Sequence, residues 1–180
     1  MMGRFIAIVG PSGVGKDSVM EAIAAAEPRI VLARRVITRP SDAGGEAFDG
    51  VSEAEFQQRA EAGDFALHWS AHGLRYGILR SVDESLAQGK DVLANLSRSV
   101  LPQAQADFSR FDVINLTATR DVLAMRLAGR GRETDAQISA RLDRVVPALP
   151  ASLRVHTIDN SRALNMTVQD IRDRLYPVRA

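Results

Sequence analysis

The sequence predicts an α/β fold in which helices cover a parallel sheet, and three observations predict it. Short apolar, β-branched segments alternate with segments of helical periodicity, the pattern of strand-helix-strand units. The first of these segments runs directly into a glycine-rich loop and then a helical pattern. Polar residues follow later strands, where parallel sheets bind ligands. With 180 residues and 46% hydrophobic content, one well-buried domain is expected.

The glycine-rich loop follows a strand predicted at Phe5–Val9 and precedes a helix predicted over about residues 16–25. Its spacing, G-x-x-x-x-G-K, is typical of a phosphate-binding loop, whose glycines let backbone N–H groups turn toward a polyphosphate. The helix N-terminus adds a positive dipole end, and the lysine adds a mobile cation. We call this segment the P-loop; it consists of Gly10, Pro11, Ser12, Gly13, Val14, Gly15, Lys16, Asp17 and Ser18.

One P-loop residue departs from the signature. The residue after the lysine is usually Ser or Thr, whose hydroxyl binds Mg²⁺, but here it is Asp17, with Ser18 following. A carboxylate is also a hard oxygen ligand, so Asp17 and Ser18 are the candidate metal ligands. Alternatively, Asp17 only stabilises the first helical turn, where negative charge is favourable.

Composition limits the partners. With 23 basic and 22 acidic residues, the formal net charge is +1, so no global field favours nucleic acid or an anionic membrane. Cysteine is absent, which excludes disulfides and thiolate metal sites and is compatible with a reducing cytosol. No apolar run approaches the ~20 residues that span a bilayer. We expect a cytoplasmic protein with a small-molecule partner; the oligomeric state stays open.

The segment after the first helix is rich in arginine. A strand predicted at residues 30–33 leads to Arg34 and Arg35, and then to Arg39 before a proline. A glycine- and acid-rich loop is expected over residues 41–50. Arginine at a loop edge suits a phosphate, because its planar fork of donors grips two oxygens. We expect this role for Arg39, whereas the other two also fit a solvated basic face.

An aromatic segment follows a helix predicted over residues 52–62. It reads as two short strands over residues 65–78 around a turn at Gly73. Such clusters between glycines are typical of a ligand wall, although the tryptophan also fits a core position and both histidines fit bystander positions. The polar aromatic residues are His68, Trp69, His72 and Tyr76.

Two further strands are predicted at residues 91–96 and 111–116, with helices near 82–89 and from Pro102. The first of these strands ends in Asn95, Ser97 and Arg98. We expect these polar side chains to face the ligand crevice.

The helix that starts near Thr119 breaks at residues 129–133, Gly-Arg-Gly-Arg-Glu, and then resumes. A glycine-flanked arginine segment can close over a polyphosphate and stabilise a transferring phosphoryl group. The alternative, solvated helices with ion pairs, does not require the break and is expected for Arg144. The arginines near the break are Arg126, Arg130, Arg132, Arg141 and Arg144.

A last strand and turn are predicted over residues 155–161, before an amphipathic helix with Val168, Ile171 and Leu175. Asn160, in the turn, either contacts a purine base or only forms the turn.

These motifs, in this order, resemble the guanylate kinase-like nucleoside monophosphate kinases over nearly the whole chain. The resemblance implies a P-loop NTPase three-layer fold with a parallel five-stranded core sheet, and ATP with Mg²⁺ as cofactors. It implies one kinase domain, residues 1–180, made of a core (1–33, 81–125 and 142–180), an acceptor-binding insert (about 34–80) and a helical lid (about 126–141). Arg126, Arg130 and Arg141 match the lid arginines of the family.

In the acceptor site, Arg39 and Tyr76 match residues that hold the acceptor phosphate in this family. The base readers differ: Leu67 replaces a carboxylate that accepts from guanine, and Ile78 replaces a hydroxyl residue. The polar edge of guanine would stay unpaired against aliphatic side chains, and such a loss of hydrogen bonds can select against a ligand by a factor of ~10⁴. We therefore expect an acceptor that carries phosphate but no guanine.

The P-loop variant, Ile37-Thr38-Arg39, His68-Trp69, residues 93–98 and Arg130-Gly131-Arg132-Glu133 together resemble the ribose 1,5-bisphosphate phosphokinases of phosphonate degradation. This resemblance implies phosphoryl transfer from ATP to the 1-phosphate of ribose 1,5-bisphosphate, giving 5-phosphoribosyl 1-diphosphate. Asn95, Ser97 or Arg98 would contact the sugar or its second phosphate. The alternatives are a guanylate kinase with an atypical base site and a non-catalytic interaction module; retention of Lys16 and the lid arginines argues against the module.

Overall fold

The computed structural model describes residues 1–42, 47–131 and 133–177. Its centre is a five-stranded parallel sheet in the order β2-β7-β1-β8-β9, which confirms the predicted fold class. The strands of this core sheet are β1 (Phe5–Val9), β2 (Ile30–Leu32), β7 (Asp91–Asn95), β8 (Phe111–Thr117) and β9 (Val155–Asp159).

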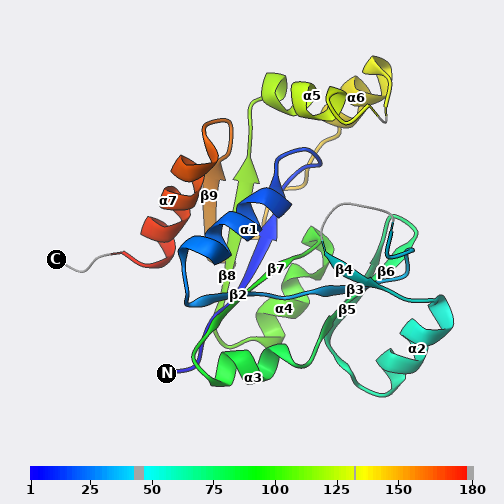
Figure 1. Cartoon of the computed structure of the whole chain (residues 1–180), viewed down its shortest axis with the longest axis vertical. Helices are drawn as coiled ribbons and strands as arrows, with labels where there is room; N and C mark the ends of the chain where they lie inside the picture. The colour runs from blue at the N-terminus through cyan, green and yellow to red at the C-terminus, as the bar shows by residue number, and fades with distance from the viewer. Residues whose placement is uncertain (43–46, 132, 178–180) are drawn as a thin grey trace.

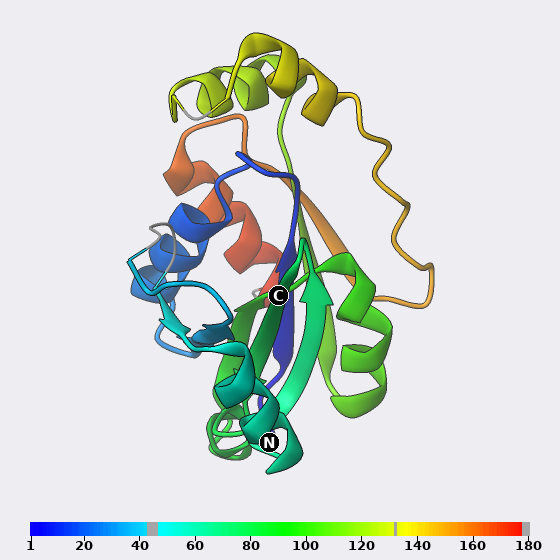
Figure 2. The same ribbon diagram turned by 90° about the vertical axis from the view of Figure 1, so that its right-hand side faces the viewer.

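Helices cover both faces of the core sheet, as Figure 2 shows, because its strands are apolar on both sides. On β1, Ile6 and Ile8 belong to the apolar cluster of α1 and α7, whereas Phe5, Ala7 and Val9 belong to the cluster of α3 and α4. These helices are α1 (Lys16–Ala26), α3 (Val82–Ala87), α4 (Leu101–Asp107) and α7 (Leu164–Leu175).

A second sheet, in the order β4-β3-β6-β5, lies beside the core (Figure 1) and falls within the predicted insert. Phe56 of α2 is fully buried against Phe65, with ring centroids 4.7 Å apart. Ser52 caps this helix as expected: its Oγ accepts from the backbone N–H of Glu55 at 3.1 Å. The elements are β3 (Arg35–Ile37), β4 (Phe48–Gly50), α2 (Glu53–Glu61), β5 (Phe65–Ala71) and β6 (Leu74–Leu79).

The predicted loop over residues 41–50 is wrong at its end, where Phe48–Gly50 forms β4 and pairs in parallel with β3. Three glycines and three acidic residues in this segment are typical of a loop, so its composition does not predict a strand. The three-residue strand forms because it pairs with β3 and because Phe48 is buried. Residues 43–46 of that loop lie outside the described residues, as does Arg132.

Two helices, α5 (Arg120–Ala128) and α6 (Asp135–Leu142), lie over the end of the core where the P-loop follows β1 (Figures 1 and 2). They correspond to the two halves of the predicted interrupted helix. A short 3₁₀ helix, Arg98–Val100, follows β7. Among the described residues, none of the helices combines the length and apolar character that a membrane crossing requires.

A buried ionic network ties the start of β1 to β7, β8 and the C-terminal helix. The Arg4 guanidinium donates to Asp91 Oδ2 at 2.8 Å and to Asp112 Oδ2 at 3.2 Å, and Tyr176 Oη donates to Asp91 Oδ2 at 2.6 Å. The side chains of Arg4 and Asp91 are each 9% exposed, and that of Asp112 is 3% exposed. Asp91 therefore depends on Arg4 for charge compensation, whereas Asp112 has Arg4 as its buried cation together with Arg154 and His156.

Replacing Arg4 by methionine is expected to destabilise the fold by about 3–5 kcal/mol, because two buried carboxylates lose their shared cation. The measurement is the free energy of unfolding from denaturant titration. Arg154 is the matched control, since its exposed guanidinium lies 3.7 Å from the same Asp112 and its replacement by methionine is expected to cost less than about 1 kcal/mol. Equal effects of the two substitutions would contradict the importance of burial.

Candidate functional site

The P-loop connects β1 to α1 and lies beneath α5 and α6 (Figure 1). Gly13 and Gly15 have φ of 83° and 95°, in the left-handed region that favours glycine. A Cβ on Gly15 would lie 2.8 Å from Asn160 Nδ2, and one on Gly10 would lie 2.8 Å from the carbonyl oxygen of Leu116. The loop is therefore a tight backbone turn at the N-terminus of an eleven-residue helix, which suits an anionic ligand.

Lys16 is folded back over this loop. Its Nζ donates to the carbonyl oxygen of Gly10 at 2.8 Å and to that of Pro11 at 3.4 Å. Burial lowers the pKa of Lys16 to about 8; Asp17 opposes this shift, while the charges of Arg35, Arg130 and Arg98 add to it. Cations from the second sheet, the α5–α6 connection and the end of β7 thus act together at Lys16.

This lowered pKa predicts how the ATP binding expected from the P-loop signature depends on pH. Below about pH 8 the Lys16 ammonium is charged, and above it the charge is lost, so the ATP dissociation constant is expected to rise by up to tenfold per pH unit. The measurement is a titration of ATP binding between pH 7 and pH 10. Lys16→Arg keeps its charge over this range, so its profile should be flat. A flat profile for the unaltered protein would contradict the role of Lys16.

Asp17 and Ser18 begin α1 beside the lysine, Asp17 half-buried and Ser18 exposed. In the part of the chain that the structure describes, no three His, Cys, Asp or Glu side chains group to hold a metal ion. Mg²⁺ at nucleotide sites is typically held by one or two protein oxygens together with substrate phosphates and water. The two side chains fit that kind of site.

A network of hydrogen bonds, which we call the brace, ties the P-loop to α5 and to the turn after β9. Arg126 donates to the carbonyl oxygens of Val14 at 3.0 Å and Asn160 at 2.8 Å. The Asn160 amide donates to Val14 O at 2.8 Å and accepts from Thr167 Oγ1 at 2.7 Å. Asn160 is only 4% exposed, so its amide positions the P-loop, and contact with a purine stays a prediction. The sequence analysis did not identify Thr167 as part of the site. Its position next to Val168, on the apolar face of the predicted helix, would have indicated a buried polar residue that needs a partner.

The other lid arginines differ in their surroundings. Arg130 is exposed in the connection between α5 and α6, next to Gly131 at φ 62°. Arg141 of α6 forms an ion pair with Glu133 at 2.8 Å. Arg130 thus lies in the connection and Arg141 on α6, and these segments lie above the P-loop in Figure 2.

On the second sheet, aromatic side chains form a wall that reaches the core. Trp69 stacks on Tyr76 with ring centroids 5.3 Å apart, and its Nε1–H donates to Ser97 Oγ at 2.9 Å. Trp69 is 8% exposed and lies in the main apolar cluster, so it serves as a core residue as well as part of the wall. The Arg39 guanidinium lies over the Phe48 ring, 4.2 Å from its centroid.

Leu67 and Ile78, which the family resemblance aligns with base-reading residues, lie in the same buried layer. Leu67 and Ile78 are 1% and 0% exposed and share the apolar cluster of Phe5 and Val82. Neither side chain can pair with a purine edge.

The end of β7 brings further polar groups to the crevice. Asn95 is buried, and its carbonyl oxygen accepts from Arg35 at 3.4 Å. Arg98 donates to Asn115 Oδ1 and to the carbonyl oxygen of Pro147, both at 3.0 Å. Arg98 is therefore held by β8 and by the connection that follows α6, and its contact with substrate stays a prediction.

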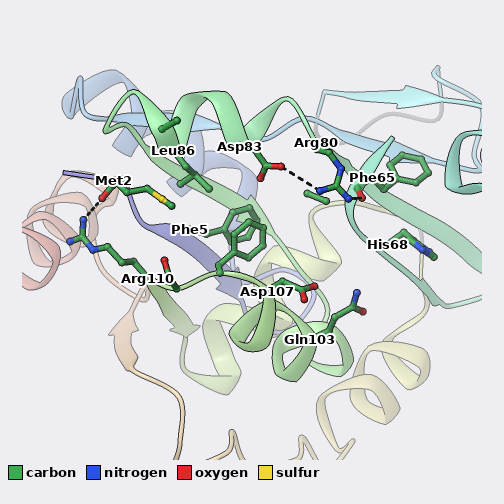
Figure 3. Close-up of a pocket in the computed structure, with 15 residues that line it drawn as sticks. Met2, Phe5, Phe65, His68, Arg80, Asp83, Leu86, Gln103, Asp107 and Arg110 are labelled. Carbon is green, nitrogen blue, oxygen red and sulfur yellow. Dashed lines mark hydrogen bonds and ion pairs between the residues drawn. The ribbon is translucent and has the colours of Figure 1, made fainter. Parts of the chain in front are cut away.

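A cavity of about 590 Å³ lies away from this site, at the amino end of β1 (Figure 3). Phe5 and Leu86 line its apolar part, and Arg80 and Asp83 form an ion pair of 3.5 Å at its edge. His68 also lines it and lies near Phe65, on the opposite face of β5 from Trp69. Because parallel sheets bind ligands at their carboxyl ends, this cavity is not the phosphate site.

Comparison with known proteins places this geometry in a family. The family model "Guanylate kinase" matches residues 2–174. A protein of Ruegeria sp. (strain TM1040) called ribose 1,5-bisphosphate phosphokinase PhnN is 57% identical over 167 residues, 92% of this chain and 88% of that protein. The protein of that name from Agrobacterium fabrum is 50% identical and covers 88% of each chain. A guanylate kinase from Anaplasma phagocytophilum shares the fold, with a TM-score of 0.67 at 18% identity over 97% of this chain and 85% of that one.

Proposed function

The chain belongs to the guanylate kinase family, and we propose that it acts within this family as a ribose 1,5-bisphosphate phosphokinase. The reaction transfers the γ-phosphoryl group of ATP to the 1-phosphate of ribose 1,5-bisphosphate and yields ADP and 5-phosphoribosyl 1-diphosphate. We propose that this reaction takes place in the cytoplasm with ATP as the phosphoryl donor. The resemblance to the ribose 1,5-bisphosphate phosphokinases further implies a role in phosphonate breakdown. The relatives that carry this name, at 50–57% identity, support the proposal.

The observation that carries the proposal is the buried pair Leu67 and Ile78. They are 1% and 0% exposed and offer no hydrogen-bonding group where the family reads guanine. Arg39, two residues after β3, and Tyr76 of β6 match the phosphate clamp of the family. A site that keeps its phosphate ligands and has lost its base readers favours a phosphorylated sugar over a nucleotide.

The proposed chemistry needs no general base, because the attacking phosphate oxygen is already anionic. This oxygen attacks the γ-phosphorus, the bond from that phosphorus to the β–γ bridging oxygen breaks, and ADP leaves with the bridging oxygen. Catalysis then depends on placement and charge neutralisation. We assign Lys16 and the P-loop N–H groups to the ATP phosphates, and Arg126, Arg130 and Arg141 to the transferring group.

The start of α1 would hold the metal ion of this reaction. Asp17 and Ser18 supply a carboxylate and a hydroxyl beside Lys16, the oxygen donors that Mg²⁺ prefers. Mg²⁺, when bound, neutralises phosphate charge. Arg39 and Tyr76 would orient the acceptor, and α5–α6 would exclude water from it.

We propose that these parts work as one kinase domain, with residues 34–80 as the acceptor insert and 126–141 as the lid. The arrangement in Figure 1 is consistent with this division, since the second sheet and α5–α6 flank the P-loop.

The direct test is incubation of the protein with ATP, Mg²⁺ and ribose 1,5-bisphosphate, followed by phosphorus NMR of the products. The proposal predicts the resonances of a diphosphate ester together with ADP, in equal amounts. Formation of ADP and inorganic phosphate without the ester would show ATP hydrolysis alone and would contradict it.

A further inference from the structure

The brace contacts the P-loop at the carbonyl oxygen of Val14. Asn160 Nδ2 donates to this oxygen at 2.8 Å, and Arg126 Nη1 donates to it at 3.0 Å. A carbonyl oxygen has two lone pairs, so the two donors satisfy both of them. Val14 is fully buried, and its carbonyl group is held from two elements, α5 and the turn after β9.

The hold on this carbonyl group also fixes the direction of the next N–H group. The C=O of Val14 and the N–H of Gly15 belong to one planar trans peptide unit, so they point in opposite directions. Because the carbonyl group points toward Asn160, the Gly15 N–H points away from the brace. Gly15 caps α1, and the first N–H groups of a helix have no acceptor within the helix, so they can bind an anion.

The orientation of the Asn160 amide is matched by Thr167 of α7. A carbonyl oxygen only accepts hydrogen bonds, so the end of the amide that faces Val14 must be its NH₂ group. The Asn160 Oδ1 then faces Thr167 Oγ1 at 2.7 Å, and the hydroxyl must donate to it. Thr167 is 0% exposed and Asn160 is 4% exposed, so bulk water does not replace this bond. The Thr167 hydroxyl therefore distinguishes the two ends of the amide.

The amide lies directly against the backbone that it orients, since a Cβ on Gly15 would lie 2.8 Å from Asn160 Nδ2. Without a donor at Thr167, the buried Asn160 Oδ1 has lost its partner, and the amide gains by turning toward another one. A turned amide places an oxygen against the carbonyl oxygen of Val14. The peptide unit between Val14 and Gly15 then loses one of its two anchors, and the Arg126 bond is left.

We propose that Thr167 is a positioning residue for phosphate binding. Its hydroxyl orients the Asn160 amide, the amide holds the Val14 carbonyl group, and the Gly15 N–H is thereby aimed at the phosphates of ATP. The inference rests on the ATP binding of the proposed function and deepens it, because the buried amide then acts on the phosphates and not on the base.

The test compares ATP with inorganic triphosphate, which has no base, by calorimetric titration of each in the presence of Mg²⁺. Thr167→Val replaces the hydroxyl by a methyl group of similar size, and both dissociation constants are expected to rise about tenfold as a hydrogen bond to an anion weakens. Thr167→Ser keeps the O–H donor, so both constants should stay within about twofold of those of the unaltered protein. Thr167→Cys, whose S–H is a weaker donor, should give an intermediate rise and serves as a second variant if the valine variant does not fold.

A kinetic measurement separates this role from a general loss of structure. In Thr167→Val the KM for ATP should rise with the dissociation constant, whereas the KM for ribose 1,5-bisphosphate at saturating ATP should stay within about twofold. The control is Ile171→Val, since Ile171 lies one turn after Thr167 on the same buried face of α7. It removes a buried methylene but keeps the hydroxyl, so it should lower thermal stability and leave both dissociation constants within about twofold.

Three results would contradict the inference. They are normal binding of both ligands by the folded valine variant, an equal loss in Thr167→Ser, and a loss for ATP without a loss for triphosphate, which would assign the effect to the base. Binding of ATP by the unaltered protein without transfer to ribose 1,5-bisphosphate would contradict the proposed function, and the dissociation constants would still decide the inference. An unaltered protein that binds neither ligand would contradict both.

Discussion

Replacing Lys16 by alanine is expected to lower kcat on the order of 10³-fold while leaving the fold intact. The ammonium lies over the P-loop, within 2.8 Å of the Gly10 carbonyl oxygen, where it can move onto the β- and γ-phosphates. Loss of one preorganised cation or donor at a transferring group commonly costs 10²–10³ in rate. The measurement is steady-state kcat at saturating ATP, with circular dichroism to follow the fold.

The chain supplies its own control for this experiment, because Lys90 is the second of its two lysines. Lys90 is exposed, and its Nζ donates to the carbonyl oxygen of Pro28 at 3.0 Å, far from the P-loop in sequence and fold. Lys90→Ala should turn over like the unaltered protein. A Lys16→Ala variant with near-normal kcat would refute the assignment of the P-loop.

Replacing Arg39 by methionine is expected to lower kcat/KM for the acceptor on the order of 10³-fold, with the KM for ATP changed less than about threefold. A bidentate arginine–phosphate contact that also aligns the attacking oxygen contributes both to binding and to placement. The structure holds the guanidinium over Phe48, so methionine can fill the same apolar space without the charge. Initial rates with each substrate varied in turn provide the measurement.

A suitable control for Arg39 is Arg59 on α2, which belongs to the same insert and pairs with Glu55 at 2.6 Å across one helical turn. Arg59→Met should leave both kinetic constants within about twofold. An equal rise in the KM of ATP and of the acceptor in Arg39→Met would contradict a clamp specific to the acceptor.

The P-loop, the first helix and the parallel sheet could be predicted because their signals are local. The run Phe5–Val9, the three glycines and Lys16 specify strand, turn and helix within about twenty residues. Departures from the family pattern at Leu67 and Ile78 also lie in the sequence itself, and the structure adds that both are buried.

Other parts of the site depend on contacts between distant segments. The brace that joins Arg126, Val14, Asn160 and Thr167 connects residues up to 146 positions apart, which no local pattern encodes. No local pattern predicts β4 either, because this strand forms through its pairing with β3.

Arg35 was equally compatible with a solvated face until the register placed it opposite Ile78. The pairing of β3 with β6 therefore decides on which face of the sheet Arg35 lies, and the sequence alone does not.

The measurement that tests the central claim most directly is kcat/KM for ribose 1,5-bisphosphate against kcat/KM for GMP, at fixed ATP and Mg²⁺. The account predicts a preference for the sugar bisphosphate of at least about 10³-fold, because in the proposed site Leu67 and Ile78 offer no hydrogen-bonding group to a guanine edge. Turnover of GMP that equals or exceeds that of the sugar would contradict it.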